Sequence, residues 1–435
     1  MSHKNINLIN SETTLFWFRR DLRIHDNVGL FHALAENNNV LPIFIFDTII
    51  LDELEDKADR RVDFIHQSLL DLKQKLEKNS SSLLILYGDP TEIFKTLKPK
   101  AVYTNHDYEP YGINRDKDVS KILHKKNIPF LTFKDHVIFE RGEIVKENGT
   151  PYTIFTPYSK KWKANFRKPV IQSPELSNLL KTEPLLFPTL TELGFKKTDI
   201  AFSPPAIAKD IIKGYAENRD YPSRNGTTKL SVHLRFGTLG IRTLILEALR
   251  KNESFLNELI WREFYQMIIY HFPNTNNSFK PKYDRIEWRN NHLEFEAWCK
   301  GKTGYPLVDA GMRELNDTGF MHNRVRMVTA SFLTKHLLID WRWGEAYFAQ
   351  KLLDFEHASN NGGWQWAAGS GCDAAPYFRI FNPMTQAKKF DAHNKYIEKW
   401  VPEYGSPAYP KPIVDHAFAR TRALEVYKKA LIGLS

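Results

Sequence analysis

The stretch TLFWFRRDLRIHDNVGLFHALAENNNVLPIFIFD, residues 14–47, begins and ends with runs of apolar and aromatic residues of strand length. These runs are Thr14–Phe18 and Val40–Phe46. Neither run alternates polar with apolar residues, as a half-exposed strand would. Near-continuous apolar strands are typical of parallel sheets covered by helices on both faces. The stretch therefore predicts that the chain begins with an α/β domain.

The same pattern continues through the first 135 residues. Three further strand-like runs are Ser82–Tyr87, Ala101–Asn105 and Ile128–Phe133, and the segments with helical character are Arg61–Lys78, Thr91–Leu97 and Asn114–Lys126. This alternation predicts a Rossmann-like parallel five-stranded sheet. Ligands of such sheets bind outside the carboxyl ends of the strands, where the polar residues are Arg19, Arg20, Asp47, Gly88, Asp89 and Glu109. The chain has no GxGxxG motif and no P-loop, so the common nucleotide fingerprints give no support.

The pattern changes twice further along the chain. Residues 136–205 are rich in proline and poorly periodic, and their stretch TPYSKKWKANFRK (156–168) carries five positive charges and no acid. From about residue 206 helical segments follow one another without strands; they are Thr243–Leu249, Glu258–Tyr270, Leu307–Glu314, Asn323–Leu338 and Ala346–Leu353. We therefore predict an α/β domain over 1–135, a long linker over 136–205 and an all-helical domain over 206–435.

Composition narrows the class of protein. The 435 residues are 42% hydrophobic and 26% charged, which is ordinary for a globular protein. No apolar run is long enough for a membrane span, and the start MSHKNINLINSETT lacks the apolar core of a signal peptide. Two cysteines, Cys299 and Cys372, cannot form a disulfide framework or a structural zinc site. We therefore expect a cytoplasmic protein.

The charge is uneven. Residues 1–135 hold 19 Lys and Arg against 20 Asp and Glu, a net of −1, whereas residues 136–435 hold 42 against 31, a net of +11. A basic half of this kind favours an anionic partner such as nucleic acid. A solvated, lysine-rich surface explains the same charge equally well.

Tryptophans gather in the predicted helical domain, which holds eight of the ten: Trp261, Trp288, Trp298, Trp341, Trp343, Trp364, Trp366 and Trp400. Core packing is the usual role of any single tryptophan. Trp364 and Trp366 differ because they lie in NNGGWQWAAGSGCDAAPYFR (360–379), among glycines, asparagines and small residues. Glycines let a backbone approach a bound ring closely, and indoles provide stacking faces for flat ligands and bases.

Three other segments carry candidate polar groups. In ELIWREFY (258–265), one helical side holds Glu258, Trp261, Arg262 and Tyr265, which suits a base and a phosphate but equally a surface ion pair beside a buried tryptophan. GFMHNRVRM (319–327) places Asn323, Arg324, Arg326 and Met327 at the head of an apolar helix, and we expect Asp354 and Glu356 to pair with these arginines. GTTKLS (226–231) precedes a helix and could hold phosphates or act as an ordinary N-cap.

Common hydrolytic chemistry finds little support. The chain has no Gly-x-Ser-x-Gly elbow, no His-x-x-x-His metal pair and no cysteine beside a histidine. A redox or light-driven cofactor surrounded by aromatic residues fits better.

Four segments together resemble the photolyase/cryptochrome family. They are TLFWFRRDLRIHDN (14–27), ELIWREFY, TGYPLVDAGMRELNDTGFMHNRVRMVTASFL (303–333) and NNGGWQWAAGSGCDAAPYFRIFNP (360–383). The resemblance covers nearly the whole chain, and within the family it is strongest to class I cyclobutane-pyrimidine-dimer photolyases. It implies an α/β domain for a light-harvesting antenna and a helical domain that binds one noncovalent FAD. It also implies that photoexcited reduced FAD donates an electron to a pyrimidine dimer in DNA and splits it.

The resemblance also implies roles for particular residues. The FAD phosphates would lie around Tyr215, Thr227, Thr228, Lys229, Leu230 and Ser231. The rest of the FAD site would comprise Phe255, Arg262, Asn323, Arg326, Asp354, Phe355, Glu356 and Asn360. Within it, Arg326 and Asp354 would form an ion pair beside the flavin. Asn360 would face flavin N5, a position at which plant cryptochromes have Asp.

The dimer and DNA would contact a second set, consisting of Arg219, Glu258, Trp261, Asn323, Arg324, Met327, Trp366 and Gln386. By the same resemblance Trp261 and Trp366 would clamp the dimer, and Glu258 would hydrogen-bond its carbonyls. The dimer would have to flip out of the duplex to reach this pocket. Trp364, Trp341 and Trp288 would pass electrons from the surface to oxidised flavin.

Alternatives remain open at the level of the sequence. A flavin photoreceptor of the cryptochrome or DASH type, with little or no duplex repair, is the contrasting hypothesis. The antenna would contact Glu109 and Pro110 if it were 5,10-methenyltetrahydrofolate, but the Cys-Lys pair of folate-binding members is missing from NNSFKPKYDRIEW (276–288). A deazaflavin, FMN or no antenna therefore stays open, with folate as the leading expectation. We further expect a monomer in the bacterial cytosol or nucleoid that binds double-stranded DNA, with no obligate protein partner and no metal.

Overall fold

The protein folds into two compact units, and its computed structural model describes residues 5–432. Unit 1 draws on Met1–Glu143, Phe166–Ile207 and Leu230–Arg250. Unit 2 draws on Ile144–Asn165, Ala208–Lys229 and Lys251–Ser435. The division differs from the three consecutive segments predicted from the sequence, because each unit is assembled from three separate pieces of chain. The limits at residues 135 and 205 describe consecutive segments of the chain, which these units do not test, and they stay predictions.

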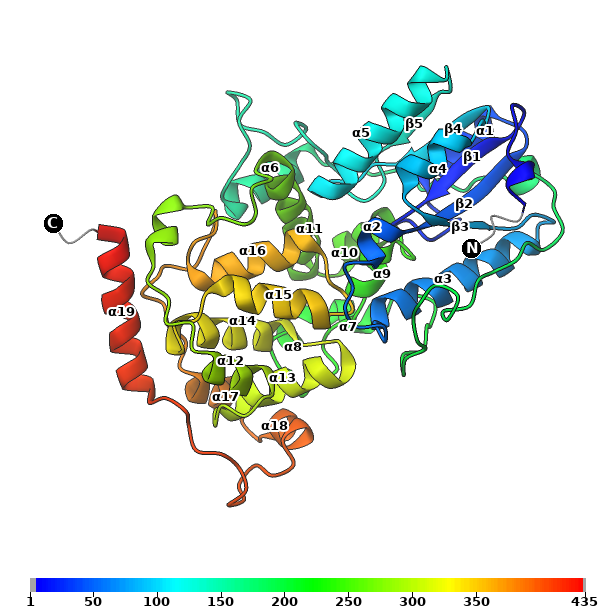
Figure 1. The fold of residues 1–435 in the computed structure, drawn as a ribbon. Helices are drawn as coiled ribbons and strands as arrows, with labels where there is room; N and C mark the ends of the chain where they lie inside the picture. The colour runs from blue at the N-terminus through cyan, green and yellow to red at the C-terminus, as the bar shows by residue number, and fades with distance from the viewer. Residues whose placement is uncertain (1–4, 433–435) are drawn as a thin grey trace. The chain divides into compact units, whose positions relative to one another are not determined.

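Unit 1 contains a five-stranded parallel sheet in the order β3-β2-β1-β4-β5 (Figure 1). The strands are β1 (Thr14–Phe18), β2 (Val40–Asp47), β3 (Leu84–Gly88), β4 (Ala101–Asn105) and β5 (Phe130–Phe133). Every residue of β1, β2 and β4 is buried, as their continuous apolar sequences predict. The predicted Rossmann-like fold is therefore confirmed.

The helices of unit 1 connect these strands. They are α1 (Val28–Glu36), α2 (Thr48–Leu51), α3 (Arg60–Glu77), α4 (Pro90–Thr96) and α5 (Pro110–Lys125), and the segment beyond residue 230 adds α9 (Ser231–Phe236) and α10 (Ile241–Lys251). Helices α3 and α4 begin at aspartates, Asp59 and Asp89, whose carboxylates accept backbone N–H groups of the first turn. Helix α1 packs against β1 and β4.

A buried ion cluster explains why α10 belongs to unit 1. Arg242 on α10 contacts the carboxylates of Asp26 at 2.6 Å and Asp135 at 2.7 Å, and Arg23 contacts Asp135 at 2.7 Å. Although burial would raise the pKa of Asp135, the two guanidinium groups hold it well below its usual range. Burying such charges is tolerable only when they are paired. The polar residues that follow β1 and β5 therefore anchor α10.

The regular secondary structure of unit 2 is helical among its described residues, apart from one isolated β-bridge between Val145 and Pro151. Its helices are α6 (Phe155–Asn165), α7 (Lys209–Lys213), α8 (Tyr215–Asn218), α11 (Glu253–His271), α12 (His292–Cys299), α13 (Pro306–Thr318), α14 (Asn323–Ser331), α15 (Trp341–Lys351), α16 (His357–Ala368), α17 (Pro383–Phe390), α18 (Lys395–Trp400) and α19 (His416–Ile432). The predicted helix 323–338 is divided, because α14 passes into a π-helical turn over Phe332–His336. Helix α6 lies within the predicted linker, whose sequence is poorly periodic.

The core of unit 2 is aromatic and aliphatic. Trp298, Trp341 and Trp364 are buried in it beside residues of α13, α14 and the π-helical turn. Helices α15 and α16 run side by side (Figure 1), and α16 also packs against α11 and α14. Helices α11, α14, α15 and α16 carry many of the candidate site residues.

Candidate functional site

Helix α11 organises the first group of predicted residues. Its N-cap residue Asn252 accepts a hydrogen bond from the backbone N–H of Phe255, which fixes where the helix begins. Trp261, Arg262 and Tyr265 follow Glu258 by three, four and seven residues, a spacing that places all four on one side of the helix. The structure gives the first three of them different partners on different segments of unit 2.

Glu258 is the end of a chain of alternating charges. Arg219 Nη1 lies 2.6 Å from Glu258 Oε1, Arg219 Nε lies 4.0 Å from Asp220 Oδ1, and Arg324 Nη2 lies 2.7 Å from the same Asp220 oxygen. The guanidinium of Arg324 also lies 4.3 Å from the ring centre of Phe390. Three predicted substrate residues, Arg219, Glu258 and Arg324, are thus brought together. Asp220, which links them, was not predicted.

Trp261 is stacked against Phe155 of α6. The ring centroids are 3.8 Å apart and the planes differ by 5°. Phe264 and Tyr265 contact the indole at 5.5 and 5.4 Å. The plane of Trp261 is therefore set by its neighbours before any ligand binds.

The acidic residues of the DFE segment pair with two different helices. Arg326 Nη2 on α14 lies 3.0 Å from Asp354 Oδ2, as predicted. Glu356 instead accepts hydrogen bonds from Arg262 and Gln266 of α11, each at 2.9 Å. The expectation that Glu356 pairs with an arginine of α14 was wrong, because Arg324 is bound to Asp220. The result links α11 to the start of α16.

The head of α14 is capped by a histidine. Nδ1 of His322 accepts a hydrogen bond from the backbone N–H of Arg324 at 3.2 Å. Burial, with the nearby cations Arg326 and Arg324, lowers the pKa of His322 to about 4, so the ring is neutral and able to accept. Asn323 donates weakly to the sulfur of Met327 one turn later, at 4.0 Å. The two residues predicted to meet the dimer therefore lie on one side of α14.

In the segment GTTKLS, which was predicted to bind phosphates, the backbone of Gly226 lies close to the backbone of Asn218. A side chain on Gly226 would clash with the backbone of Asn218. Lys229 adopts φ 53° and its ammonium lies 5.2 Å from the ring of Phe320, which Arg326 approaches from 5.9 Å. Helix α9 follows, with Leu230 as its N-cap and no side-chain cap. The ordinary N-cap interpretation of GTTKLS is therefore wrong, because Thr227, Thr228 and Ser231 do not cap α9.

Tyr215 and Phe255 form the aromatic part of the predicted cofactor set. Their rings meet edge to face at 5.1 Å, and Arg219 lies 5.3 Å from the ring centre of Tyr215. Burial and the charge of Glu258 raise the pKa of Tyr215. Phe355, also in the predicted set, packs against the core of unit 2.

Helix α16 carries Asn360, Trp364 and Trp366. The Asn360 amide Nδ2 donates to the backbone oxygen of Glu345 at 3.1 Å and to Glu345 Oε1 at 2.9 Å. Trp364 lies against Gly344 of α15, where any side chain would overlap the indole. The rings of Trp366 and Phe381 have centroids 6.5 Å apart and planes that differ by 28°. Gln386 on α17 has a buried Oε1 without a hydrogen-bond partner among residues 5–432.

The three tryptophans expected to carry electrons differ in exposure. Trp364 and Trp341 are buried, at 2% and 1% exposed, whereas Trp288 is only partly buried. Arg342 lies 4.8 Å from the ring centre of Trp341, and Tyr427 lies 6.0 Å from that of Trp288. A gradient from a buried to a partly exposed indole suits the expected direction of electron delivery.

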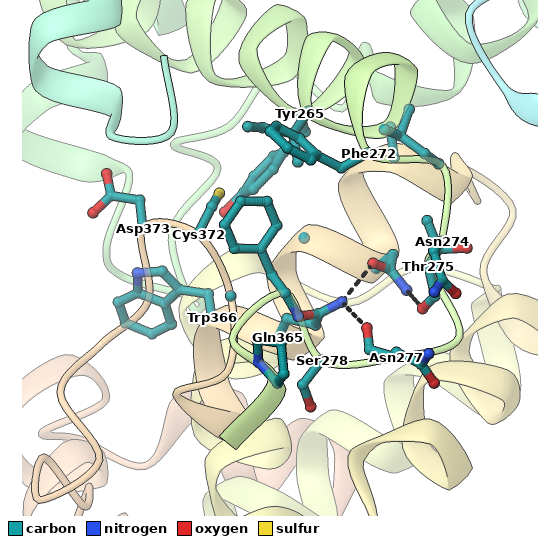
Figure 2. A pocket seen from close by; sticks show the side chains of 18 of the residues that line it. Tyr265, Phe272, Asn274, Thr275, Asn277, Ser278, Gln365, Trp366, Cys372 and Asp373 are labelled. Atoms are coloured by element: carbon teal, nitrogen blue, oxygen red, sulfur yellow. Dashed lines mark hydrogen bonds between the residues drawn. The ribbon is translucent and has the colours of Figure 1, made fainter. Parts of the chain in front are cut away.

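A cavity of about 490 Å³ opens between α11, α16 and the loop that follows α11 (Figure 2). Its lining includes Tyr265, Phe272, Thr275, Trp366 and Cys372. On its polar side, Gln365 donates to Asn361 Oδ1 and to the backbone oxygen of Asn277, and Asn361 donates to the backbone oxygen of Thr275. Trp366 and Tyr265 are the two candidates from the sequence that lie in this lining, and sequence reasoning did not predict the cavity itself.

The predicted antenna residues lie in unit 1. Pro110 begins α5 and Glu109 precedes it, without capping the helix through its side chain. The carboxylate of Glu109 lies 3.2 Å from Arg20 Nη1, which also contacts Asp107 at 3.2 Å. The polar residues at the carboxyl edge of the sheet thus form ion pairs with one another.

Sequence reasoning missed several residues that contact predicted site residues, among them Phe155, Asp220 and Glu345. Phe155 lies in a segment whose sequence shows no helical periodicity. Glu345 lies in a segment rich in aromatic residues, WRWGEAYF, where no pattern marks it as a site residue. Asp220 had a visible signal, since it adjoins Arg219. Among the residues that the structure describes, no cluster of His, Cys, Asp and Glu could hold a metal ion, and no helix is long and apolar enough to cross a membrane.

Comparison with known proteins gives consistent matches over both units. The family model described as DNA photolyase matches residues 14–175, and the model described as the FAD binding domain of DNA photolyase matches residues 255–407. The chain is similar to a deoxyribodipyrimidine photo-lyase from Synechococcus sp., with 38% identity over 95% of this chain and 96% of that protein.

Solved structures agree. A bacterial class III photolyase from Agrobacterium tumefaciens has a TM-score of 0.85 and 32% identity, covering 97% of this chain and 98% of its own. An archaeal photolyase from Sulfolobus tokodaii, solved with two FAD molecules, has a TM-score of 0.83 and 34% identity, covering 96% of this chain and all of its own, 100%.

Proposed function

Because this chain belongs to the DNA photolyase family, we propose that it repairs pyrimidine dimers in DNA with light, using FAD. The observation that carries the proposal is the joint arrangement of Glu258, Arg219 and Arg324 beside Trp261 on α11. A carboxylate, an aromatic plane and two guanidinium groups are the partners that extruded bases of one strand and their phosphates require. The photoreceptor alternative is not favoured, because the curated relatives are photo-lyases.

FAD fits the groups present in unit 2. Asn360 Oδ1 accepts no hydrogen bond within residues 5–432, so it is available to a ring N–H. Thr227 and Thr228 carry hydroxyls before the strained backbone of Lys229, which suits a pyrophosphate. Arg326 and Asp354 supply an ion pair for the polar edge of the ring. FAD, once bound and reduced, supplies the electron on excitation.

The chain's own residues would bind and orient the dimer. Trp261, held flat by Phe155, would stack on it, and Trp366 would bound the pocket on its other side. Glu258 would hydrogen-bond the dimer's carbonyls when its carboxyl is protonated, or orient Arg219 toward them when it is not. Asn323 and Met327 would line the remaining wall.

DNA binding would rest on phosphates. Arg219, Arg324 and Gln386 would contact the backbone of double-stranded DNA, because contacts of this type supply the sequence-independent affinity. Opening the duplex costs least at a damaged pair, which is poorly stacked. We propose a monomer in the cytosol, with the α/β domain, linker and helical domain divided near residues 135 and 205.

An antenna is proposed for the α/β domain, with 5,10-methenyltetrahydrofolate as the first candidate and Glu109 and Pro110 as its contacts. The ion pair between Glu109 and Arg20 would have to open or rotate to admit it. The absorption spectrum of purified protein tests this, because folate adds a near-violet band that can be removed without losing FAD.

Illuminated repair is the decisive experiment. Purified protein with reduced FAD should restore a thymine-dimer oligonucleotide in blue light and not in darkness. Denaturation should release about one FAD per chain. Protein that retains FAD yet repairs no dimer in single- or double-stranded DNA would support the photoreceptor alternative, and protein that binds no flavin would contradict the whole proposal.

A further inference from the structure

The amide of Asn360 has a fixed orientation. Both of its hydrogen bonds run from Nδ2 to Glu345 on α15, one to the backbone oxygen and one to the carboxyl oxygen. A backbone oxygen can only accept, so Nδ2 must face Glu345 whatever the protonation state of the carboxyl. Oδ1 is thereby directed to the side on which the flavin is proposed.

Glu345 in turn faces a histidine. Nδ1 of His357, the first residue of α16, lies 3.9 Å from Glu345 Oε1. The other ring nitrogen of His357 lies 3.0 Å from the hydroxyl of Thr275. Thr275 lines the cavity beside α11 (Figure 2). Polar contacts therefore run from this cavity through Thr275, His357 and Glu345 to Asn360.

Charged groups near this pair have partners of their own. His357 is the titratable group that faces Glu345, and burial raises the pKa of Glu345 while His357 and the Asn360 amide oppose that rise. The neighbouring carboxylate of Glu356 is taken up by Arg262 and Gln266 of α11. Arg342 on α15 donates hydrogen bonds to Asp284 and to the backbone oxygen of Asn276, both in the segment that follows α11.

We propose that Glu345 takes up a proton when the bound flavin is reduced, and that His357 and Thr275 deliver this proton from the cavity. The inference rests on the proposed function, since it places the flavin against Asn360. Its physical basis is that a negative charge gained near a buried carboxylate favours protonation of that carboxylate. Glu345 would thus compensate the charge of the reduced flavin without giving that proton to it.

The step balances. Two electrons from an added reductant, with one proton, convert oxidised flavin to its anionic reduced form. A second proton comes from bulk solvent by way of water in the cavity, which is left neutral; it passes the Thr275 hydroxyl and the His357 imidazole and binds a carboxylate oxygen of Glu345. His357 ends in its starting protonation state. Imidazole suits this transfer because it exchanges protons near neutral pH. A water molecule or a small ring rotation would close the 3.9 Å separation.

Proton stoichiometry tests the proposal in the FAD-bound protein. The flavin's midpoint potential is measured in darkness across mildly acidic to mildly alkaline pH, and its slope gives the protons bound per two electrons. Glu345→Gln keeps an oxygen for Asn360 Nδ2 but cannot titrate, so it should bind about one proton fewer than the unaltered protein. Glu263→Gln is the control, because Glu263 is also a carboxylate of unit 2, more deeply buried than Glu345, and accepts from Trp162 at 2.6 Å instead of contacting Asn360.

The pathway is tested by the rate. His357→Leu should slow proton uptake after rapid flavin reduction at least tenfold, followed with a pH-indicator dye, while the final number of protons stays unchanged. Unaltered uptake in His357→Leu would remove His357 from the path. Equal proton stoichiometry in Glu345→Gln and the unaltered protein would overturn the proposal.

A measurement on the unaltered protein keeps the test independent of variants that fail to fold. The infrared difference spectrum of reduced minus oxidised protein should contain a new band from a protonated carboxyl group. Absence of this band would overturn the inference, even where dimers are repaired. Loss of flavin binding or of repair would instead contradict the proposed function, so the two failures are distinguishable.

Discussion

Phe155 lies flat against Trp261, with ring centroids 3.8 Å apart and planes within 5°. One segment far from α11 in sequence thus holds the indole that is proposed to stack on the dimer. Because stacking needs one free face and a fixed plane, the contact makes Phe155 a positioning residue for the clamp. It also covers one face of the indole, so the dimer would have to use the other.

Phe155→Ala should weaken the preference for damaged over undamaged DNA. An aromatic pair contributes about 1 kcal/mol beyond its buried area, so we expect discrimination to fall about fivefold. Trp261→Ala should reduce it further, by ~1–3 kcal/mol of lost base stacking. Titrations with matched damaged and undamaged duplexes measure both effects. Equal weakening for the two DNAs would mean that Trp261 is a general DNA platform or a core residue.

Substitutions of Arg324 and of Asp220 should change the affinity for DNA in opposite directions. Arg324→Ala should weaken binding to both DNAs and reduce the log–log salt slope by about one unit, because each phosphate contact contributes roughly −0.9. Asp220 neutralises Arg324 at 2.7 Å, so Asp220→Asn should strengthen binding to both. Binding measured over a series of salt concentrations separates these outcomes. An unchanged salt slope in Arg324→Ala would mean that Arg324 contacts no phosphate and has a structural role.

The sheet and most helices could be predicted because their signal is local. The residues of β1 and β2 are apolar throughout, and α11 shows its period directly. The division into two units could not be predicted, because it depends on the long-range ion cluster of Arg242 with Asp26 and Asp135. Charges of this kind look like surface residues in a sequence.

The same limit applies to the site. Arg326 and Asp354 were paired correctly through the family resemblance, while Glu356 was assigned to the wrong helix. Which arginine a carboxylate meets depends on helix packing, and the sequence carries no pattern for it. Glu345 and His357 could not have been found, since their interest arises only from contact with Asn360 and the cavity.

Gly344→Ala should destabilise the protein. The added methyl group would overlap the ring of Trp364 and the side chain of Leu333, and such overpacking costs about 1–3 kcal/mol of unfolding free energy. Gly363→Ala is the control, because the same change on α16 meets nothing within 4 Å and should be neutral or stabilising by up to ~1 kcal/mol. Denaturant unfolding compares the two. Similar stabilities would show that α15 can move away from Trp364.

His322 should make stability depend on acid. Its pKa falls to about 4 in the folded protein, below the usual value of about 6.5, so the unfolded chain binds the proton more readily between these values. Stability should therefore decrease as pH falls from about 6.5 toward 4. His322→Asn replaces the capping Nδ1 with an N-cap oxygen that does not titrate, so its stability should fall less steeply with pH. Parallel slopes for the two proteins would exclude His322 as a source of the pH dependence.

Trp364→Phe should block the photoreduction of oxidised FAD while repair by chemically reduced protein stays nearly intact. Trp364 is proposed to deliver the electron that loads the flavin, whereas repair needs only reduced flavin next to the dimer. Trp298→Phe is the matched control, because Trp298 is a buried indole 6.0 Å from Trp364 that lies outside the proposed path. Absorption during blue illumination follows photoreduction, and dimer repair is measured after reduction with dithionite. Equal loss of both activities in Trp364→Phe would make Trp364 a packing residue. Lost photoreduction in Trp298→Phe would show instead that electrons reach Trp364 through Trp298 and not through Trp341 and Trp288.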